Sequence, residues 1–71
     1  MVAGQKPLLS DRQLEVLLLV AKGHMDKDIA KFCCVEHTTI KAHLRRIRDL
    51  LGTQNRTHSV AVALTKGYIS L

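Results

Sequence analysis

The basic side chains between residues 41 and 48 are the part of this sequence best suited to bind another molecule. Four of the chain's eleven lysines and arginines lie there: Lys41, Arg45, Arg46 and Arg48. Asp49 is the only carboxylate in the segment 37–51 that could offset them. Arginine forms bidentate hydrogen bonds with guanine, and both lysine and arginine bind phosphate. The cluster therefore predicts a polyanionic partner, although such a face can also be simply solvated.

The segment 37–51 has the periodicity of an amphipathic helix. Its apolar side chains fall on one face at a 3.6-residue period: Ile40, Leu44, Ile47 and Leu51. Opposite them lie Thr38, Ala42, Arg45 and Asp49, with Lys41 and Arg48 at their side. One face is thus predicted to join a core, while the other presents small polar and cationic side chains typical of a helix that enters a DNA groove.

The composition bounds the class of protein. With 71 residues, the chain forms one small domain, and its net charge of +5 and pI near 9.7 favour a polyanion. The two aromatic residues, Phe32 and Tyr68, lie outside the basic segment, which argues against a single-strand binder that stacks bases on aromatic rings. Double-stranded DNA fits better.

The sequence offers no sign of catalysis, of a bound metal or cofactor, or of a membrane segment. Cys33 and Cys34 are adjacent, which disfavours a disulfide between them, and their spacing to the histidines matches no zinc pattern. The longest apolar run, residues 16–21, is too short to span a bilayer. We therefore expect a cytoplasmic, non-enzymatic protein.

Two further helices are predicted before the basic one, behind a flexible arm over residues 1–7. The first begins at a capping box formed by Ser10 and Gln13 and ends at Gly23. Its predicted core face is Leu14, Leu17, Leu18 and Ala21, widened by Val16 and Val20. The second is capped by Asp26. It turns Ile29, Ala30 and Cys33 inward and Lys27 and Lys31 outward.

A short turn over residues 34–36 links the second helix to the basic one, an arrangement typical of a helix-turn-helix. The basic helix ends near Gly52, and a fourth helix is predicted over residues 57–66 with Gly67 as its stop. Its predicted core face is Val60, Ala61 and Leu64. The tail 68–71 either folds back or remains coil. We expect an all-α, four-helix domain over residues 8–71.

Several motifs at fixed spacing resemble the LuxR/FixJ-type (GerE-like) helix-turn-helix domain of bacterial transcription regulators. In order they are Leu9-Ser10-x-Arg12-Gln13-Leu14-Glu15-Val16-Leu17, Val20-Ala21-x-Gly23, Lys27-Asp28-Ile29-Ala30, Thr39-Ile40-Lys41-x-His43-Leu44, Leu51-Gly52 and Asn55-Arg56-Thr57. The likeness covers about Leu8 to Ile69. Met25 and Asp26 depart from the usual Ser-Asn, Glu36 from a capping Ser, Leu50 from Lys, and Thr53 from Val.

The resemblance implies a third helix in the major groove and a fourth helix that makes a dimer contact. Base or groove contacts then fall to Lys41, Ala42 and Arg45, to which His37 is added because it begins the basic helix. Phosphate contacts fall to Lys27, Thr38, Thr39 and Arg56, with Arg46 added from its place on the helix. Dimer contacts fall to the otherwise surface-exposed His58, Val62 and Thr65. For Arg56, local hydrogen bonds at the start of the fourth helix are an equal alternative.

These observations favour a sequence-specific regulator that binds double-stranded DNA, as a homodimer. The alternative is a helical adaptor that dimerises or docks on another protein, such as RNA polymerase, through the fourth helix. A third hypothesis is an RNA-binding or nucleoid-coating protein without operator preference. His43 is expected at the edge of the core rather than on DNA.

Overall fold

Four helices make up the architecture of residues 8–71, the part of the chain that the structure, a computed structural model, describes. They are α1 (Asp11–Ala21), α2 (Asp26–Cys33), α3 (His37–Leu51) and α4 (Arg56–Thr65). No strand occurs in this range, so the predicted all-α class is confirmed. The arm predicted over residues 1–7 lies outside the described residues.

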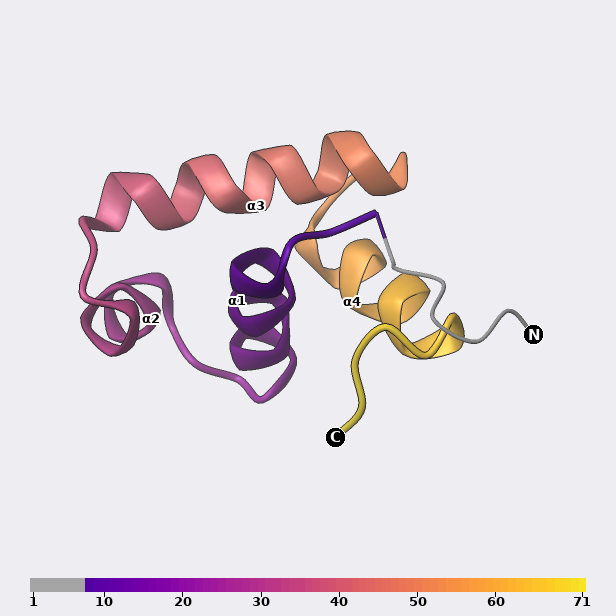
Figure 1. Cartoon of the computed structure of the whole chain (residues 1–71), viewed down its shortest axis with the longest axis horizontal. Helices are drawn as coiled ribbons and strands as arrows, with labels where there is room; N and C mark the ends of the chain where they lie inside the picture. The colour runs from indigo at the N-terminus through magenta and orange to yellow at the C-terminus, as the bar shows by residue number, and fades with distance from the viewer. Residues whose placement is uncertain (1–7) are drawn as a thin grey trace.

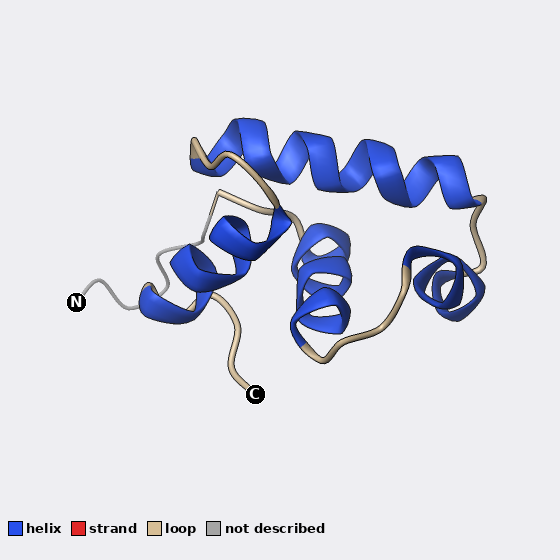
Figure 2. Cartoon of the chain, turned by 180° about the vertical axis from the view of Figure 1, so that it is seen from behind, coloured by secondary structure: helices blue, strands red, loops and turns tan. Residues whose placement is uncertain are grey.

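The longest helix, α3, lies across one side of the other three. Figure 1 shows α1 and α4 beneath it and α2 near its N-terminal end, and the view from behind shows the same order (Figure 2). Helix α1 packs against all three others, and so does α3, whereas α2 and α4 do not pack against each other. This arrangement leaves one long side of α3 free of neighbouring helices.

The core faces predicted for α2 and α3 are confirmed. Ile40, Leu44 and Ile47 of α3 are buried, with Leu51 partly buried beside them. On α2, Ile29, Ala30 and Cys33 are buried, while Lys27 and Lys31 are exposed. His43 is half-buried at the edge of the core, as expected. Both helices have a clear polar face, so their periodicity alone identifies the buried side.

The core face predicted for α1 is partly wrong. The buried residues are Val16, Leu17 and Leu19, while Leu14, Leu18 and Ala21 are only partly buried. The physical reason is that α1 contacts three helices and therefore buries side chains around much of its circumference. A single stripe of apolar residues does not describe such a central helix.

The core face predicted for α4 is wrong in two of its three residues. Ala61 and Leu64 are exposed and Val60 is half-buried, whereas Ser59 and Ala63 are fully buried. Residues 60–64 are all apolar, so the sequence offers no polar face to orient the helix. The small side chains of Ser59 and Ala63 suit a helix that lies close against its neighbours.

The helix boundaries follow their capping residues. The capping box is confirmed, because the backbone N–H of Gln13 donates to Ser10 Oγ at 3.2 Å and the backbone N–H of Ser10 donates to Gln13 Oε1 at 2.8 Å. Gly52, at φ +68°, ends α3 as predicted. Asp26 is not the cap predicted for α2. Met25 takes that position without a side-chain hydrogen bond, and Asp26 is the first helical residue.

The turn between α2 and α3 depends on Cys34. Its backbone is left-handed, at φ 58° and ψ 43°, and among residues 8–71 it is the only non-glycine residue with a positive φ. This conformation lets the Val35 amide donate to the Ala30 carbonyl at 3.0 Å, which closes the end of α2. The turn therefore places a strained side chain at the centre of the helix-turn-helix.

The C-terminal tail folds back, the first of the two predicted alternatives. The Tyr68 amide donates to the Ala63 carbonyl at 2.8 Å, and Ile69 is 7% exposed within the core cluster. No helix formed by residues 8–71 has both the length and the apolar character needed to cross a membrane.

Candidate nucleic-acid interface

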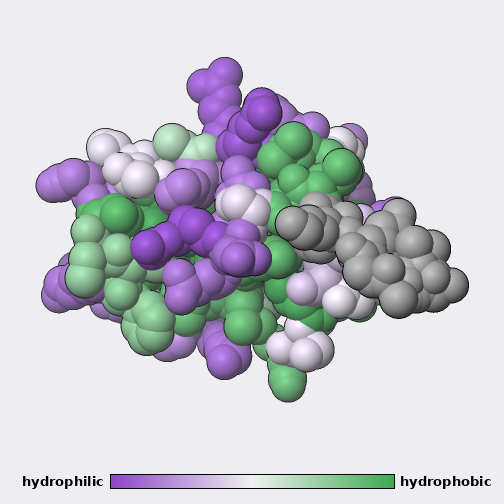
Figure 3. Space-filling model, in the orientation of Figure 1, coloured by the Kyte–Doolittle hydropathy of each residue, from purple (hydrophilic) through white to green (hydrophobic). Residues whose placement is uncertain are grey.

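The outward side of α3 carries the predicted base-contact residues together. His37, Lys41, Ala42 and Arg45 are all exposed, on the same helix whose opposite side is buried through Ile40, Leu44 and Ile47. Among the described residues, Lys41, Arg45 and Arg46 form no ion pair. In Figure 3, hydrophilic side chains project from the upper edge of the molecule, where α3 lies. The helix can therefore approach a polyanion without first breaking internal contacts.

The predicted phosphate-contact residues are less uniform. Lys27, Thr38 and Arg46 are exposed, whereas Thr39 is half-buried. Lys27 lies in the first turn of α2, which approaches the N-terminal end of α3 in Figure 1. These side chains therefore lie on two neighbouring helices, as the geometry of a helix-turn-helix on DNA requires.

Arg56 is engaged in a contact that the sequence did not predict. Its Nη2 donates to Asp26 Oδ2 at 3.0 Å, and its Nη1 donates to Asp26 Oδ1, so the guanidinium and the carboxylate form a bidentate ion pair. Local hydrogen bonds from Arg56 at the start of α4 were the alternative, and they are not what the side chain forms. Contact between Arg56 and phosphate stays a prediction.

The carboxylate of Asp26 also lies near α3. His37 Nε2 is 3.9 Å from Asp26 Oδ2, and Asp26 is the more enclosed partner, with 14% of its side chain exposed against 51% for His37. The hydrogen bond from Arg56 lowers the pKa of Asp26, partial burial opposes that shift, and the charges of Arg56, His37 and Lys41 add to it. Asp26 thus lies within the electrostatic reach of two predicted base-contact residues.

The ion pair with Asp26 also shifts the pKa of Arg56. The hydrogen bond to Asp26 raises the pKa of its guanidinium, burial opposes this, and the Asp26 charge adds to it. No local sequence pattern could have revealed the pair, because the two residues are thirty positions apart. The only sequence signal for the ion pair was that Asp26 and Arg56 carry opposite charges and lie in the first turns of their helices.

A second set of contacts fixes the far end of α2 against α1. Arg12 Nη1 donates to the Cys33 carbonyl oxygen at 3.3 Å, and Cys33 Sγ donates to Glu15 Oε1 at 3.9 Å. Arg12 also pairs with Glu15 at 3.5 Å. A carbonyl at a helix C-terminus lacks an intrahelical partner, so the Arg12 bond satisfies it and helps hold the turn before α3.

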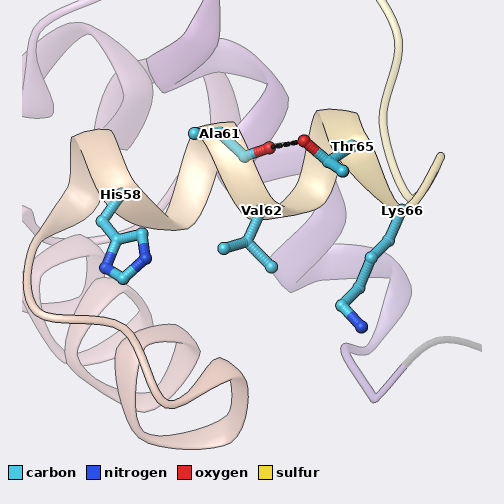
Figure 4. A pocket seen from close by; sticks show the side chains of 5 residues that line it. All are labelled: His58, Ala61, Val62, Thr65 and Lys66. Atoms are coloured by element: carbon cyan, nitrogen blue, oxygen red, sulfur yellow. Dashed lines mark hydrogen bonds between the residues drawn. The ribbon is translucent and has the colours of Figure 1, made fainter.

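The exposed side of α4 forms a shallow groove. It is lined by the predicted dimer-contact residues together with two neighbours: His58, Ala61, Val62, Thr65 and Lys66. Figure 4 shows His58, Val62 and Lys66 projecting to one side of the helix. The Thr65 hydroxyl donates to the Ala61 carbonyl at 2.8 Å, so it is satisfied within the helix. The exposed surface of the groove around Val62 is mostly apolar.

The two cysteines differ in exposure. Cys33 is buried and Cys34 is exposed, and both are free thiols. Within residues 8–71, no three His, Cys, Asp or Glu side chains come together as ligands for a metal ion.

Residues 7–63 match the model of the family described as bacterial regulatory proteins, luxR family. The response regulator protein VraR of Staphylococcus aureus is 36% identical over 62 residues, as is VraR of Staphylococcus saprophyticus. The match covers 87% of this chain but only 30% of either relative, so the chain spans less than a third of their length.

Two solved structures share the fold. The transcription factor GerE superposes with a TM-score of 0.88 at 25% identity, covering 92% of this chain and 97% of GerE. A phage VqmA–DPO complex superposes with a TM-score of 0.81 at 33% identity, covering 92% of this chain and 30% of that one.

Proposed function

Since the chain belongs to the luxR family of bacterial regulatory proteins, we propose that it binds double-stranded DNA in a sequence-specific manner and thereby regulates transcription. One observation carries the proposal. The face of α3 opposite the buried Ile40, Leu44 and Ile47 is exposed and cationic, and in the described residues its Lys41 and Arg45 have no ion-pair partner. A DNA-binding regulator of bacteria acts in the cytoplasm, where we place this one.

The proposed mode of binding inserts α3 into the major groove. Arg45 can form a bidentate contact with guanine, and Lys41 can do the same or bind a phosphate. Ala42 is small enough to allow close approach and to touch a thymine methyl group. Lys27, Thr38, Thr39 and Arg46 are proposed to hold the flanking phosphates, which fix the register of the helix without reading sequence.

Two copies are proposed to bind together through α4. A single domain of this size offers few contacts, while specific affinity at physiological salt needs an extensive interface. The groove around Val62 supplies open apolar surface on the side of α4 that carries His58 and Thr65. A two-fold pair would present its α3 helices to half-sites about one helical turn apart.

Selection from a library of random duplexes, followed by fluorescence anisotropy on the enriched sequence, tests the proposal. We expect a defined motif to be enriched and its affinity to fall steeply with salt. Binding of all duplexes alike would instead support a nucleoid-coating protein. Affinity no greater than weak charge attraction would support the adaptor hypothesis, and either result would overturn the proposed function.

A further inference from the structure

We propose that Asp26 limits how tightly the domain binds DNA, because its carboxylate holds Arg56 away from the phosphate backbone. The inference rests on the proposed function, and it concerns the affinity of the same interface for duplexes of any sequence.

A carboxylate and a phosphate compete for the same side of a guanidinium. Arg56 presents two of its N–H groups to the two oxygens of Asp26. A phosphate accepts the same parallel pair of hydrogen bonds, in a similar planar geometry. While the ion pair is intact, this fork of Arg56 is not available to DNA.

Without the ion pair, Arg56 is able to reach a ligand from solvent. Its side chain is 40% exposed, whereas that of Asp26 is 14% exposed. Arg56 also lines an open hollow between α1 and α4 together with Gly23, His24 and Thr57. The Asp26 carboxylate is therefore the more buried partner. If the ion pair breaks, the Arg56 guanidinium is the group that becomes available to DNA.

Asp26 lies beside the predicted contact surface. His37 Nε2 is 3.9 Å away, and the charge of Lys41 also acts on the carboxylate. A negative charge at this place lowers the positive potential that attracts any duplex. It also leaves the base-reading side chains of α3 intact, because Lys41 and Arg45 form no ion pair within the described residues.

Release of Arg56 should strengthen binding to cognate and random duplexes alike. Random binding depends on the number of phosphates neutralised, and each additional one steepens the slope of log K against log salt by about 0.9. Cognate binding draws part of its free energy from base contacts, which Arg56 does not make. Withholding one cation therefore lowers cognate and random affinity by a similar factor and leaves their ratio unchanged.

The experiment compares Asp26→Asn with Asp28→Asn by anisotropy, on a random duplex and on the enriched duplex, between 50 and 200 mM salt. Both substitutions remove one negative charge from the first turn of α2, but Asp28 forms no ion pair among residues 8–71. We expect Asp26→Asn to raise random affinity by about fivefold and to steepen the salt slope by about 0.9. Affinity for the enriched duplex should rise by a similar factor, while Asp28→Asn should change random affinity less than twofold.

The double variant Asp26→Asn/Arg56→Gln identifies the cation that is released. We expect it to lose the gain seen with Asp26→Asn alone. Circular dichroism and thermal unfolding establish that each variant is folded, and Asp26→Ser, which also suits the start of a helix, takes its place if the asparagine variant does not fold.

The inference is overturned if Asp26→Asn behaves like Asp28→Asn, or if its gain persists without Arg56. Failure of the proposed function looks different, because the unmodified domain would then enrich no sequence at all.

Discussion

Asp26 in the first turn of α2 and Arg56 in the first turn of α4 form a bidentate ion pair between two helices that do not pack against each other. Each of these helices instead contacts α1 and α3. The pair therefore joins α2 directly to α4 on the side of the basic helix that faces the core.

Acid should weaken the domain through this pair. Because the pKa of Asp26 is lowered in the folded state, the pair stabilises the fold above the usual carboxyl pKa of 3.8, and that stability is lost as the pH falls through the folded-state value. Asp26→Asn should cost about 1 kcal/mol at pH 7, a modest amount because Arg56 is partly exposed, and clearly less near pH 2, where protonation of Asp26 has begun to remove the pair. Urea unfolding at both pH values measures the difference, with Asp49→Asn as an exposed control. Equal costs at the two pH values would contradict the prediction.

Arg45 and Lys27 should affect DNA binding in different ways. Arg45→Ala should cost about 1–3 kcal/mol of discrimination at one base position of the enriched duplex, because it removes a base contact. Lys27→Ala should weaken cognate and random duplexes alike and reduce the salt slope by about 0.9, because it removes a phosphate contact. Anisotropy on single-base variants of the duplex distinguishes the two patterns. An equal loss on every duplex for Arg45→Ala would remove it from base recognition.

A charge in the α4 groove should prevent two copies from binding cooperatively. Val62→Glu places a carboxylate on the apolar surface between His58 and Lys66, where pairing would have to desolvate it. Electrophoretic mobility on a duplex with two half-sites should then show independent rather than joint occupancy. Leu64→Glu is the matched control, because Leu64 is an exposed residue of α4 outside the groove. Cooperative binding by Val62→Glu would rule out this dimer contact.

Cys34→Gly should stabilise the domain. A side chain in the left-handed region costs about 1–2 kcal/mol, and the greater freedom of glycine in the unfolded chain cancels part of that gain. We expect a net gain of about 0.5–1 kcal/mol, or a rise in Tm of about 2–8 °C for a domain of this size. Cys34→Ala keeps the strain and removes only the thiol, so thermal unfolding should show no such gain for it. A glycine variant no more stable than the alanine variant would mean that the turn relieves its strain elsewhere.

The buried hydroxyl of Ser59 should couple α4 to the preceding loop. Ser59 Oγ donates to the Asn55 carbonyl at 3.0 Å and lies 2.6 Å from Thr53 Oγ1, so the Thr53 hydroxyl donates to Ser59. Thr53→Val and Ser59→Ala should each cost about 1 kcal/mol, with the double variant costing less than the sum. A urea-unfolding double-mutant cycle measures this coupling. Strict additivity would show that the hydroxyl pair contributes nothing of its own.

The sequence predicted the features that depend on near neighbours. The capping box at Ser10 and Gln13, the glycine stop at Gly52 and the buried side of α3 all arise within one or two turns of helix, where periodicity and capping chemistry act. The order of the four helices was also predicted from capping residues and periodicity, and the observed fold confirms it.

The features that the sequence did not predict depend on tertiary packing. The residues next to Asp26 predict that it caps α2. Its side chain instead pairs with Arg56, which is thirty residues away. The burial of Ser59 in place of Leu64 follows from how α4 sits against the rest of the bundle, and a run of five apolar residues cannot encode that rotation. Cys34 takes a conformation that its residue type disfavours, because the turn requires it.

The return of Ile69 to the core bears on how this domain can be joined to other proteins. Ser70 and Leu71 are exposed, so an affinity tag or a fluorescent protein attached after Leu71 would extend into solvent. A fusion point at Gly67 would instead remove Ile69 from the core cluster. The shortened domain would then expose apolar core residues to solvent, which favours aggregation.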